Sequence, residues 1–258
     1  MEVAVCIKAV KSSLMAKNAG QTDEFVINPY DLHALKGVLR HKESHGLEVT
    51  CISMASRNAE DALLRCIALG ADKAVLLCDS AFSGADTVAT TYTLAAAVEK
   101  LGKYSLIVCG GQSIDGETGQ VPYGIAQRLN IQCIANVRNV LDLSDDEVVL
   151  ETISDEYITK LRARLPVVTA FQDFLTSYEN ISLVSLKKAK RRGILIVDAE
   201  QLGVDKRKCG IQGSKTKVME VCEDRKEKRN EGLIYVSGTS SEKAYFIHEL
   251  LTDSGASI

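Results

Sequence analysis

The sequence predicts an α/β protein built on a doubly wound, mostly parallel sheet, with an added hairpin and a C-terminal extension. Two observations lead to this prediction. Short apolar runs alternate with segments of helical periodicity over the first two-thirds of the chain. The apolar runs are almost unbroken, which is typical of parallel strands that are buried on both faces of a sheet. Right-handed crossovers between such strands place helices on both faces.

The expected elements follow one another in a regular order. Each predicted strand is a short apolar run, and the strands cover residues 2–10, 47–55, 73–79 and 104–111. The predicted helices each have one apolar face, and they cover residues 28–44, 58–70, 86–102 and 119–130. Gly70 and Gly102 fit the ends of two of these helices, because glycine commonly follows the last helical turn.

Composition excludes several classes of protein. The chain has 258 residues, of which 46% are apolar, and its net charge is −3. Such a balanced charge argues against a general nucleic-acid binder. No apolar run reaches the roughly 18 residues of a membrane span, and residues 1–10 do not resemble a signal peptide. We therefore expect no membrane span and a cytoplasmic location.

The eight cysteines form no C-x-x-C pair, and several of them lie inside predicted strands. Structural metal sites need paired ligand spacing, which is not seen here. We therefore expect buried, reduced thiols and no metal site.

Polar or glycine-rich residues follow three of the predicted strands, at 8–11, 53–56 and 110–120. Ligands of parallel sheets bind outside the carboxyl ends of the strands. The third stretch lies in CGGQSIDGETGQVPYGIAQRL, residues 109–129, where glycines leave backbone N–H groups accessible and a helix N-terminus follows. Both features favour phosphate binding. Neither G-x-G-x-x-G nor a P-loop is present, so a plain glycine turn remains an alternative.

Several segments, taken in their order and spacing, resemble electron transfer flavoprotein β subunits. They are VAVCIKAV at 3–10, INPYDLHAL at 27–35, CIALGADKAVLL at 66–77, LRARLPVVTAF at 161–171 and SLVSLKKAKRRGI at 182–194. The glycine-rich stretch resembles the phosphate-binding loop of the same family. The resemblance implies a Rossmann-like, adenine nucleotide α-hydrolase-like fold and a subunit that is not active alone.

The resemblance also implies a partner and a cofactor. A family β subunit pairs with an α subunit that carries one FAD, and itself holds either a second FAD or a structural AMP. DGETGQV at 115–121 is similar to the members that bifurcate electrons. In those members NADH supplies electrons to the β-subunit FAD, and the acceptors are ferredoxin and, through the α-subunit FAD, a dehydrogenase of the acyl-CoA or lactate type. A β subunit that holds AMP remains the alternative, and an ATP-binding domain of the universal-stress type is a third class.

The family's nucleotide-binding positions match residues along the first half of this chain. By resemblance, the cofactor-binding residues are Cys6, Ala9, Asn28, Asp31, Ser53, Met54, Gly111, Gln112, Asp115, Gly116, Glu117, Thr118, Gly119, Gln120 and Val121. Asn28 could equally cap the helix that begins at Pro29. No residue is expected to be catalytic, because the flavin performs the redox chemistry.

The last third of the sequence has a different character. Alternating residues around 154–156 predict a hairpin that extends the sheet. Residues 182–192 resemble the family's partner-docking loop, although a solvated charged run would have the same composition. By resemblance, the docking residues are an apolar anchor and five bases, Leu183, Lys187, Lys188, Lys190, Arg191 and Arg192. We expect residues 1–193 to form the nucleotide-binding domain and residues 194–258 to form an arm that contacts the α subunit.

Overall fold

The computed structural model describes residues 1–14, 24–172, 181–216 and 237–253. The chain divides into two units, Met1–Lys217 and Val218–Ile258. The first unit holds the sheet and the candidate site. Within the described part of the second unit there is one helix, α9 (Ser240–Asp253), and the Glu242 carboxylate at its start accepts hydrogen bonds from the backbone N–H and hydroxyl of Thr239.

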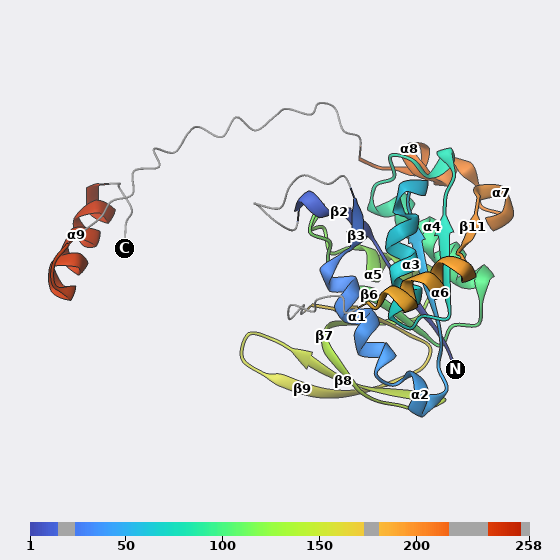
Figure 1. The fold of residues 1–258 in the computed structure, drawn as a ribbon, viewed down its shortest axis with the longest axis horizontal. Coiled ribbons are helices and arrows are strands. Elements are labelled where there is room, and N and C mark those ends of the chain that lie inside the picture. Colours follow the sequence, from blue (N-terminus) through green and yellow to red (C-terminus); the bar gives the residue numbers. More distant parts are fainter. Residues whose placement is uncertain (15–23, 173–180, 217–236, 254–258) are drawn as a thin grey trace. The chain divides into compact units, whose positions relative to one another are not determined.

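The first unit is built on one large twisted sheet, shown in Figure 1. In the described residues the strand order is β11-β5-β4-β1-β6-β10-β7-β8-β9. Pairing is parallel from β11 to β7 and antiparallel from β7 to β9. The parallel strands are β1 (Glu2–Cys6), β4 (Glu48–Met54), β5 (Lys73–Leu77), β6 (Leu106–Gly110), β10 (Val167–Phe171) and β11 (Leu195–Val197). The remaining strands are β7 (Gln132–Leu143), β8 (Glu147–Ile153) and β9 (Ile158–Arg164).

Helices cover both faces of the parallel strands (Figure 1). One face carries α1 (Pro29–Leu39), α3 (Glu60–Leu69) and α6 (Leu183–Arg192). The other face carries α4 (Thr87–Leu101), α5 (Val121–Leu129) and α7 (Ala199–Leu202). The predicted doubly wound α/β fold is therefore confirmed.

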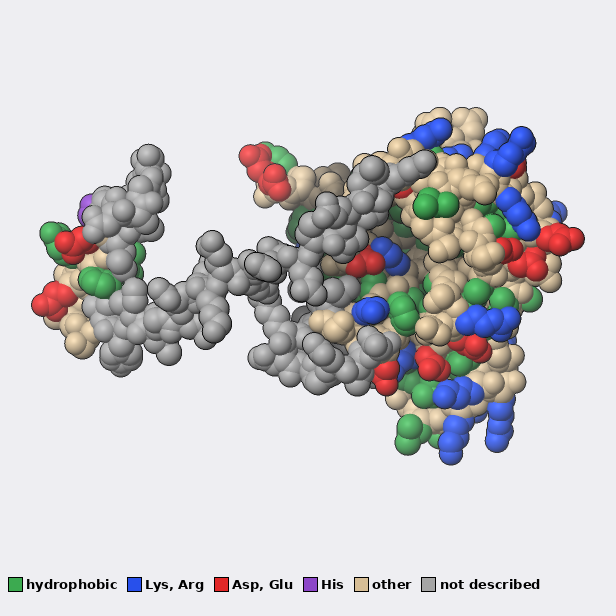
Figure 2. Space-filling view, turned by 90° about the horizontal axis from the view of Figure 1, so that it is seen from above, with side chains coloured by type: hydrophobic (Ala, Val, Ile, Leu, Met, Phe, Trp, Pro, Cys, Tyr) green, Lys and Arg blue, Asp and Glu red, His purple; other side chains and the backbone are tan. Residues whose placement is uncertain are grey.

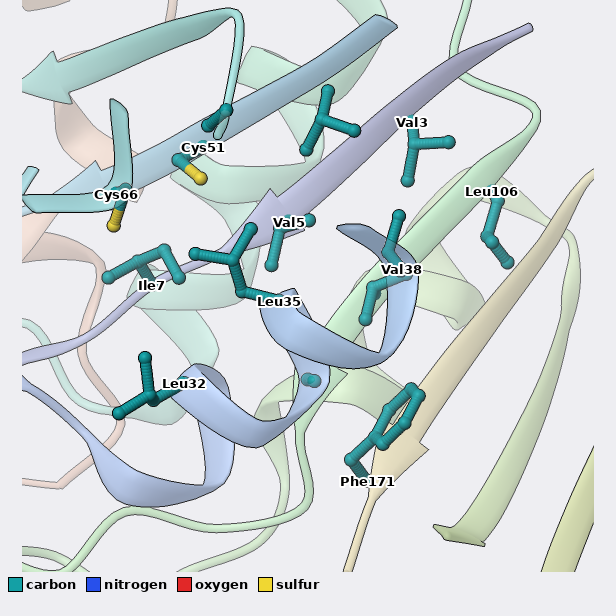
Figure 3. Close-up of a cluster of buried hydrophobic side chains, with 14 of the residues drawn as sticks. Val3, Val5, Ile7, Leu32, Leu35, Val38, Cys51, Cys66, Leu106 and Phe171 are labelled. Atoms are coloured by element: carbon teal, nitrogen blue, oxygen red, sulfur yellow. The ribbon is translucent and has the colours of Figure 1, made fainter. Parts of the chain in front are cut away.

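Side chains of successive strand residues enter different cores, as the two-residue period of a strand requires. Val3 and Val5 of β1 pack under α1, whereas Ala4 and Cys6 pack on the opposite face. Figure 3 shows the first of these cores, in which Leu35 of α1 lies among strand side chains. Strands with apolar side chains on both faces therefore read as the unbroken apolar runs seen in the sequence.

The structure differs from the predicted elements at three places. The strand expected at 2–10 ends at Cys6, and β2 (Ala9–Lys11) pairs separately with β3 (Phe25–Ile27). The helix expected at 28–44 ends at Leu39 and is followed by the short α2 (Lys42–His45). Between them, the His41 ring bonds to the carbonyl of Val140 on β7. Strand β7 was not predicted, whereas the hairpin of β8 and β9 was predicted correctly.

Residues 194–216, which the sequence alone assigns to the arm, lie in the first unit. The reason is that β11 adds to the sheet beside β5, and that η4 (Lys206–Lys208) and α8 (Gly210–Gly213) continue from it within the same unit. Of the predicted arm, residues 217–236 and 254–258 lie outside the described residues.

None of the helices in the described segments combines the length and apolar character needed to cross a membrane. None of the seven cysteines in those segments forms a disulfide, and five of them are buried: Cys6, Cys51, Cys66, Cys109 and Cys209. Cys222 lies outside the described residues.

Candidate nucleotide-binding site

A cavity of about 670 Å³ opens at the carboxyl ends of β1, β4 and β6. Its lining combines the ends of these strands with the N-termini of α1, α4 and α5 and with the loop 111–120. A ligand-binding cleft at this edge is the arrangement expected of an open parallel sheet. The three stretches that the sequence analysis singled out after separate strands thus contribute residues to one cavity.

A buried carboxylate at the start of α1 connects two of these strand ends. Asp31 Oδ2 accepts the backbone N–H of Lys8 at 2.7 Å, and Oδ1 accepts that of Gly110 at 2.9 Å. Burial raises the pKa of Asp31 to about 7, although the hydrogen bonds it accepts act in the opposite direction. A Cβ atom at position 110 would lie 2.2 Å from Asp31 Oδ1, so this contact requires glycine. Asp31 therefore holds together Lys8 and Gly110, two lining residues that follow or end different strands, and we call this part the floor of the cavity.

Asn28 connects α1 to the glycine-rich loop. Its Nδ2 donates to the carbonyl of Gln112 at 2.9 Å, and its Oδ1 accepts the N–H of Ile114 at 3.3 Å. Asn28 occupies the N-cap position of α1, but its side chain makes no capping hydrogen bond. The side chain of this buried residue therefore binds the loop and does not cap the helix that follows it.

The loop itself depends on backbone conformations that favour glycine. Gly119 has a φ of 62°, and a Cβ there would approach the carbonyl oxygen of Gly111 to 3.2 Å. Glu117 also has a positive φ, of 52°. Gly111 donates its N–H to the carbonyl of Phe171 at 2.7 Å, which ties the loop to β10. The loop thus lines the cavity with both glycines and polar residues, immediately before the N-terminus of α5.

A lysine at the end of β1 brings positive charge to this loop. Lys8 Nζ lies 2.6 Å from Asp115 Oδ1 and 3.2 Å from Ser113 Oγ. Burial opposes ionisation of Asp115, but the hydrogen bonds from Lys8 and Ser113 outweigh it and lower its pKa. Because Lys8 also lines the cavity, its ammonium group could serve a phosphate there.

The opposite wall of the cavity is held by Asp86, at the N-cap of α4. Its Oδ1 accepts the N–H groups of Val88 and Ala89 at 2.9 and 3.0 Å. Its Oδ2 accepts those of Lys215 and Thr216 at 2.6 and 3.0 Å. Burial would raise the pKa of Asp86, but the backbone donors outweigh it and lower the pKa to about 2. One carboxylate therefore fixes two segments that are far apart in the chain.

The structure brings most of the predicted cofactor residues to the cavity. Those that line it are Cys6, Asn28, Asp31, Met54, Gly111, Gln112, Gly116, Thr118, Gly119, Gln120 and Val121. Those that do not line it are Ala9, Ser53, Asp115 and Glu117. The buried Ser53 hydroxyl lacks a hydrogen-bond partner in the described residues.

Other lining residues were not among the predicted cofactor residues, although Lys8 lies in the stretch 8–11 that the sequence analysis singled out. They include Lys8, Phe82, Asp86, Thr87, Thr90, Leu94 and Thr216. An aspartate before a helical period signals an N-cap, which would have identified Asp86. No local pattern indicates that Thr216 lies beside it, because 130 residues separate the two.

The predicted docking segment is not a loop but helix α6. Ser182 caps it by accepting the N–H of Ser185 at 3.0 Å, and Ala189 is buried in the core. Leu183 and Val184 in its first turn are 78% and 63% exposed. The five bases of this segment are exposed as well, and three of them lie in the last turn, where positive charge suits the helix dipole.

Fold and cavity together define a doubly wound protein with a large cavity at the carboxyl edge of its sheet. Residues 19–190 match the electron transfer flavoprotein domain. The chain belongs to the electron transfer flavoprotein family, as a member of the β-subunit type. The universal-stress alternative is therefore wrong.

Similar proteins cover most of the chain. Protein FixA of Azorhizobium caulinodans is 37% identical over 86% of this chain and 84% of its own length. The electron transfer flavoprotein subunit beta of Clostridium acetobutylicum is 32% identical over 97% of this chain and 98% of its own. The caffeyl-CoA reductase-Etf complex subunit CarD of Acetobacterium woodii is 33% identical over 84% and 86%, respectively. This chain therefore has an electron-transfer role.

Proposed function

We propose that the cavity holds FAD and that this chain is the NADH-oxidising subunit of an electron-bifurcating flavoprotein. The observation that supports this most directly is the loop 111–120, whose left-handed Gly119 turns the chain beside a cavity large enough for a cofactor. When bound, FAD would take electrons from NADH and supply them to ferredoxin and, through the α-subunit FAD, to a dehydrogenase.

The residues present suit a dinucleotide cofactor. Gly111 and Gly119 both line the cavity, and their surroundings leave little room for a side chain: a Cβ at Gly111 would lie 3.0 Å from the Phe171 carbonyl oxygen, and one at Gly119 3.2 Å from the Gly111 carbonyl oxygen. Lys8, which pairs with Asp115 of the same loop, would also be a donor for a phosphate, and the N-terminus of α5 adds its dipole. Val121 and Met54 add apolar surface to the lining, as a flavin ring system would need. These residues bind and orient the cofactor, and none of them has to move a proton.

An alternative within the family is a structural AMP in the same cavity. AMP has one phosphate, whereas the two phosphates of FAD need backbone access at two points of the loop. Gly116 and Gly119 provide such access, and DGETGQV at 115–121 resembles the bifurcating members. These two features favour FAD.

The partners proposed here follow from the family and from exposed parts of the chain. We propose an α subunit contacted through the C-terminal arm, and a dehydrogenase of the acyl-CoA or lactate type docked on α6 around Leu183. The name of the CarD relative places that protein in a complex with a caffeyl-CoA reductase. That name favours a partner acting on CoA thioesters. The free thiols of the described residues suit a cytoplasmic location.

The proposed cofactor site is tested by Gly119→Asp, with Gly119→Asn as the matched control. Both variants add a side chain of similar size at a left-handed position, but only aspartate adds negative charge beside the phosphates. We expect Gly119→Asp to lose the β-site cofactor at a cost of roughly a few kcal/mol in binding. The α-subunit FAD should stay. The measurement is cofactor content after gel filtration of the αβ complex, and equal retention in both variants would contradict the proposed site.

A further inference from the structure

A second, smaller pocket is lined in part by Gly213 and Lys215, next in the chain to a residue of the cofactor cavity. Its volume is about 220 Å³, which is the space of about seven water molecules at roughly 30 Å³ each. Thr216 lines the cofactor cavity, whereas its neighbour Lys215 lines this pocket. The pocket is therefore separate from the cavity but shares one wall with it.

The pocket collects positive charge. Four of its lining residues are basic, and none is acidic: the bases are Arg128, Arg207, Lys208 and Lys215. Figure 2 looks down on the side of the first unit that carries α8, and Lys and Arg side chains are spread over this face with Asp and Glu side chains among them. Arg128 and Lys208 approach the same ring, with their charged groups 5.5 and 5.6 Å from the centroid of Tyr92. An anion bound beside both cations would be attracted by each of them.

The Arg128 guanidinium is held in place before any ligand arrives. Its Nε donates to Thr91 Oγ1 at 3.2 Å, and its Nη2 donates to the carbonyl of Val88 at 3.0 Å. Charged side chains on a surface are usually solvated and mobile. The Arg128 side chain, by contrast, is held against α4 by two hydrogen bonds and by the ring of Tyr92. A fixed planar donor loses little entropy when it binds an oxyanion.

The carboxylates close to the pocket are already engaged. Asp205 accepts hydrogen bonds from Nε and Nη2 of Arg207 at 3.0 Å, together with one from its backbone N–H. Asp86 is occupied by the backbone of Lys215 and of its neighbours. In the described residues, this leaves Arg128, Lys208 and Lys215 with no carboxylate partner within salt-bridge distance.

We propose that this pocket is an anion site that binds a phosphate group, either free or esterified. Guanidinium and ammonium groups converging on a small polar space are the donors that phosphate oxygens need. Inorganic phosphate and a sugar phosphate share this chemistry. The backbone of Lys215 is fixed by Asp86, so the pocket keeps its shape next to the cofactor cavity.

The test is calorimetric titration of the full-length chain, in the form in which it purifies, at constant ionic strength. One arm uses inorganic phosphate and the other uses ribose 5-phosphate, which lacks the base needed for the cofactor cavity. We expect saturable binding with a Kd below about 10 mM. Equal affinity for both probes would indicate recognition of the phosphate alone, and tighter binding of ribose 5-phosphate would indicate an esterified ligand.

Lys208→Gln combined with Lys215→Gln should weaken phosphate binding by about tenfold or more. Arg128→Lys should weaken it as well, because lysine keeps the charge but loses the planar donors. The matched control is Lys103→Gln, an exposed lysine beyond the opposite end of α4. The proposal is overturned if neither probe binds saturably, if the double variant binds within about twofold of the unmodified chain, or if the control loses as much affinity.

Discussion

The cavity end of the sheet and the first turn of α6 use their polar and apolar residues in opposite ways. At the cavity, Asp31, Asn28 and Asp86 are hydrogen-bonded within the chain, and each of them fixes a wall. At α6, Leu183 and Val184 point their apolar surface outward. The first region is organised to keep a fixed shape around a ligand, and the second offers surface to a partner. Substitutions in the two regions should therefore fail in different assays.

The largest effect is expected from Gly110→Ala, at the floor of the cavity. The added Cβ would lie 2.2 Å from Asp31 Oδ1 and 2.7 Å from Tyr30 Cβ, and both atoms belong to buried residues. We expect a loss of about 3 kcal/mol in the free energy of unfolding. The matched control is Gly116→Ala, whose nearest neighbour would be 3.7 Å away, and it should change stability little. Urea denaturation measures both, and an equal loss in the two variants would refute the assigned role of Gly110.

The next largest effects on the free energy of unfolding are expected at Asp86 and Asp31, the two carboxylates that hold segments around the cavity. In Asp86→Asn an amide NH₂ replaces one carboxylate oxygen, and it faces backbone N–H donors in either orientation of the amide. We expect a loss of about 2 kcal/mol in the free energy of unfolding. Asp31→Asn also turns an NH₂ toward a backbone donor, but it should cost less, about 1 kcal/mol, because the raised pKa leaves Asp31 largely protonated at pH 6 and no charged hydrogen bonds are lost. Thermal or urea unfolding at pH 6 measures the difference. The reverse order would mean that the walls are held by other contacts.

The same two groups predict opposite pH dependences. The folded pKa of Asp31 is raised from 3.8 to about 7, so its folded state binds a proton that the unfolded chain releases. Its contribution to stability should fall as the pH rises from about 4 to about 7, with a slope of about 1.4 kcal/mol per pH unit. The folded pKa of Asp86 is lowered to about 2, so its contribution should be lost as the pH falls from about 4 to about 2.

Unfolding curves across this range, for the unmodified chain and for Asp31→Asn, isolate the first slope. The variant should lack it between about pH 4 and pH 7, while keeping the loss of stability at lower pH that Asp86 produces. If the two proteins have the same slope, Asp31 does not bind a proton in the folded state near neutral pH.

The smallest effect on stability is expected at α6. Leu183→Ala removes a side chain that is 78% exposed, so the free energy of unfolding should change by less than about 0.5 kcal/mol. Electron delivery to the dehydrogenase should slow, while flavin reduction by NADH stays unchanged. Stopped-flow reduction and dehydrogenase turnover separate the two steps, with Leu195→Ala as the control for an exposed leucine on β11. Slower flavin reduction in Leu183→Ala would place α6 at the cofactor or subunit interface instead.

Neutralising the bases of α6 should lower the rate at which the protein associates with the dehydrogenase, and should weaken the dependence of that rate on salt concentration. Exposed charges act over roughly 10 Å at 0.1 M salt, so they steer the encounter more than they hold the complex. Turnover measured across ionic strength tests this expectation, and an unchanged salt dependence would argue against steering by this helix.

The parts of the fold that could be predicted are those with a local signal. The buried parallel strands are apolar on both faces, and so they read as apolar runs. Strand β7 was missed because its period is interrupted: Asn136 has a φ of 56°, and the pairing with β8 shifts register after Val137 and again after Val140. Helix α6 could have been predicted, since Ser182 caps it and Leu183, Leu186 and Ala189 follow at helical spacing.

The residues of the candidate site that could be predicted are likewise those with a local signal in the sequence. The glycine-rich loop and Asn28 were found because short motifs mark them. The stretch that contains Lys8 was singled out, but the contacts of Lys8 and Asp86 were not predicted because they depend on which segments meet in space: Lys8 reaches Asp115 across 107 residues, and Asp86 reaches Lys215 across 129. No periodicity encodes such long-range contacts, which arise only when the sheet brings its carboxyl ends together.

The most direct test of the central claim is the flavin content of the purified αβ complex. FAD and AMP are released by denaturation, separated by chromatography and counted against protein. Bifurcation with a cofactor in the 670 Å³ cavity predicts two FAD per heterodimer and no AMP. One FAD together with one AMP would contradict the account and assign the chain to the simple electron carriers of its family.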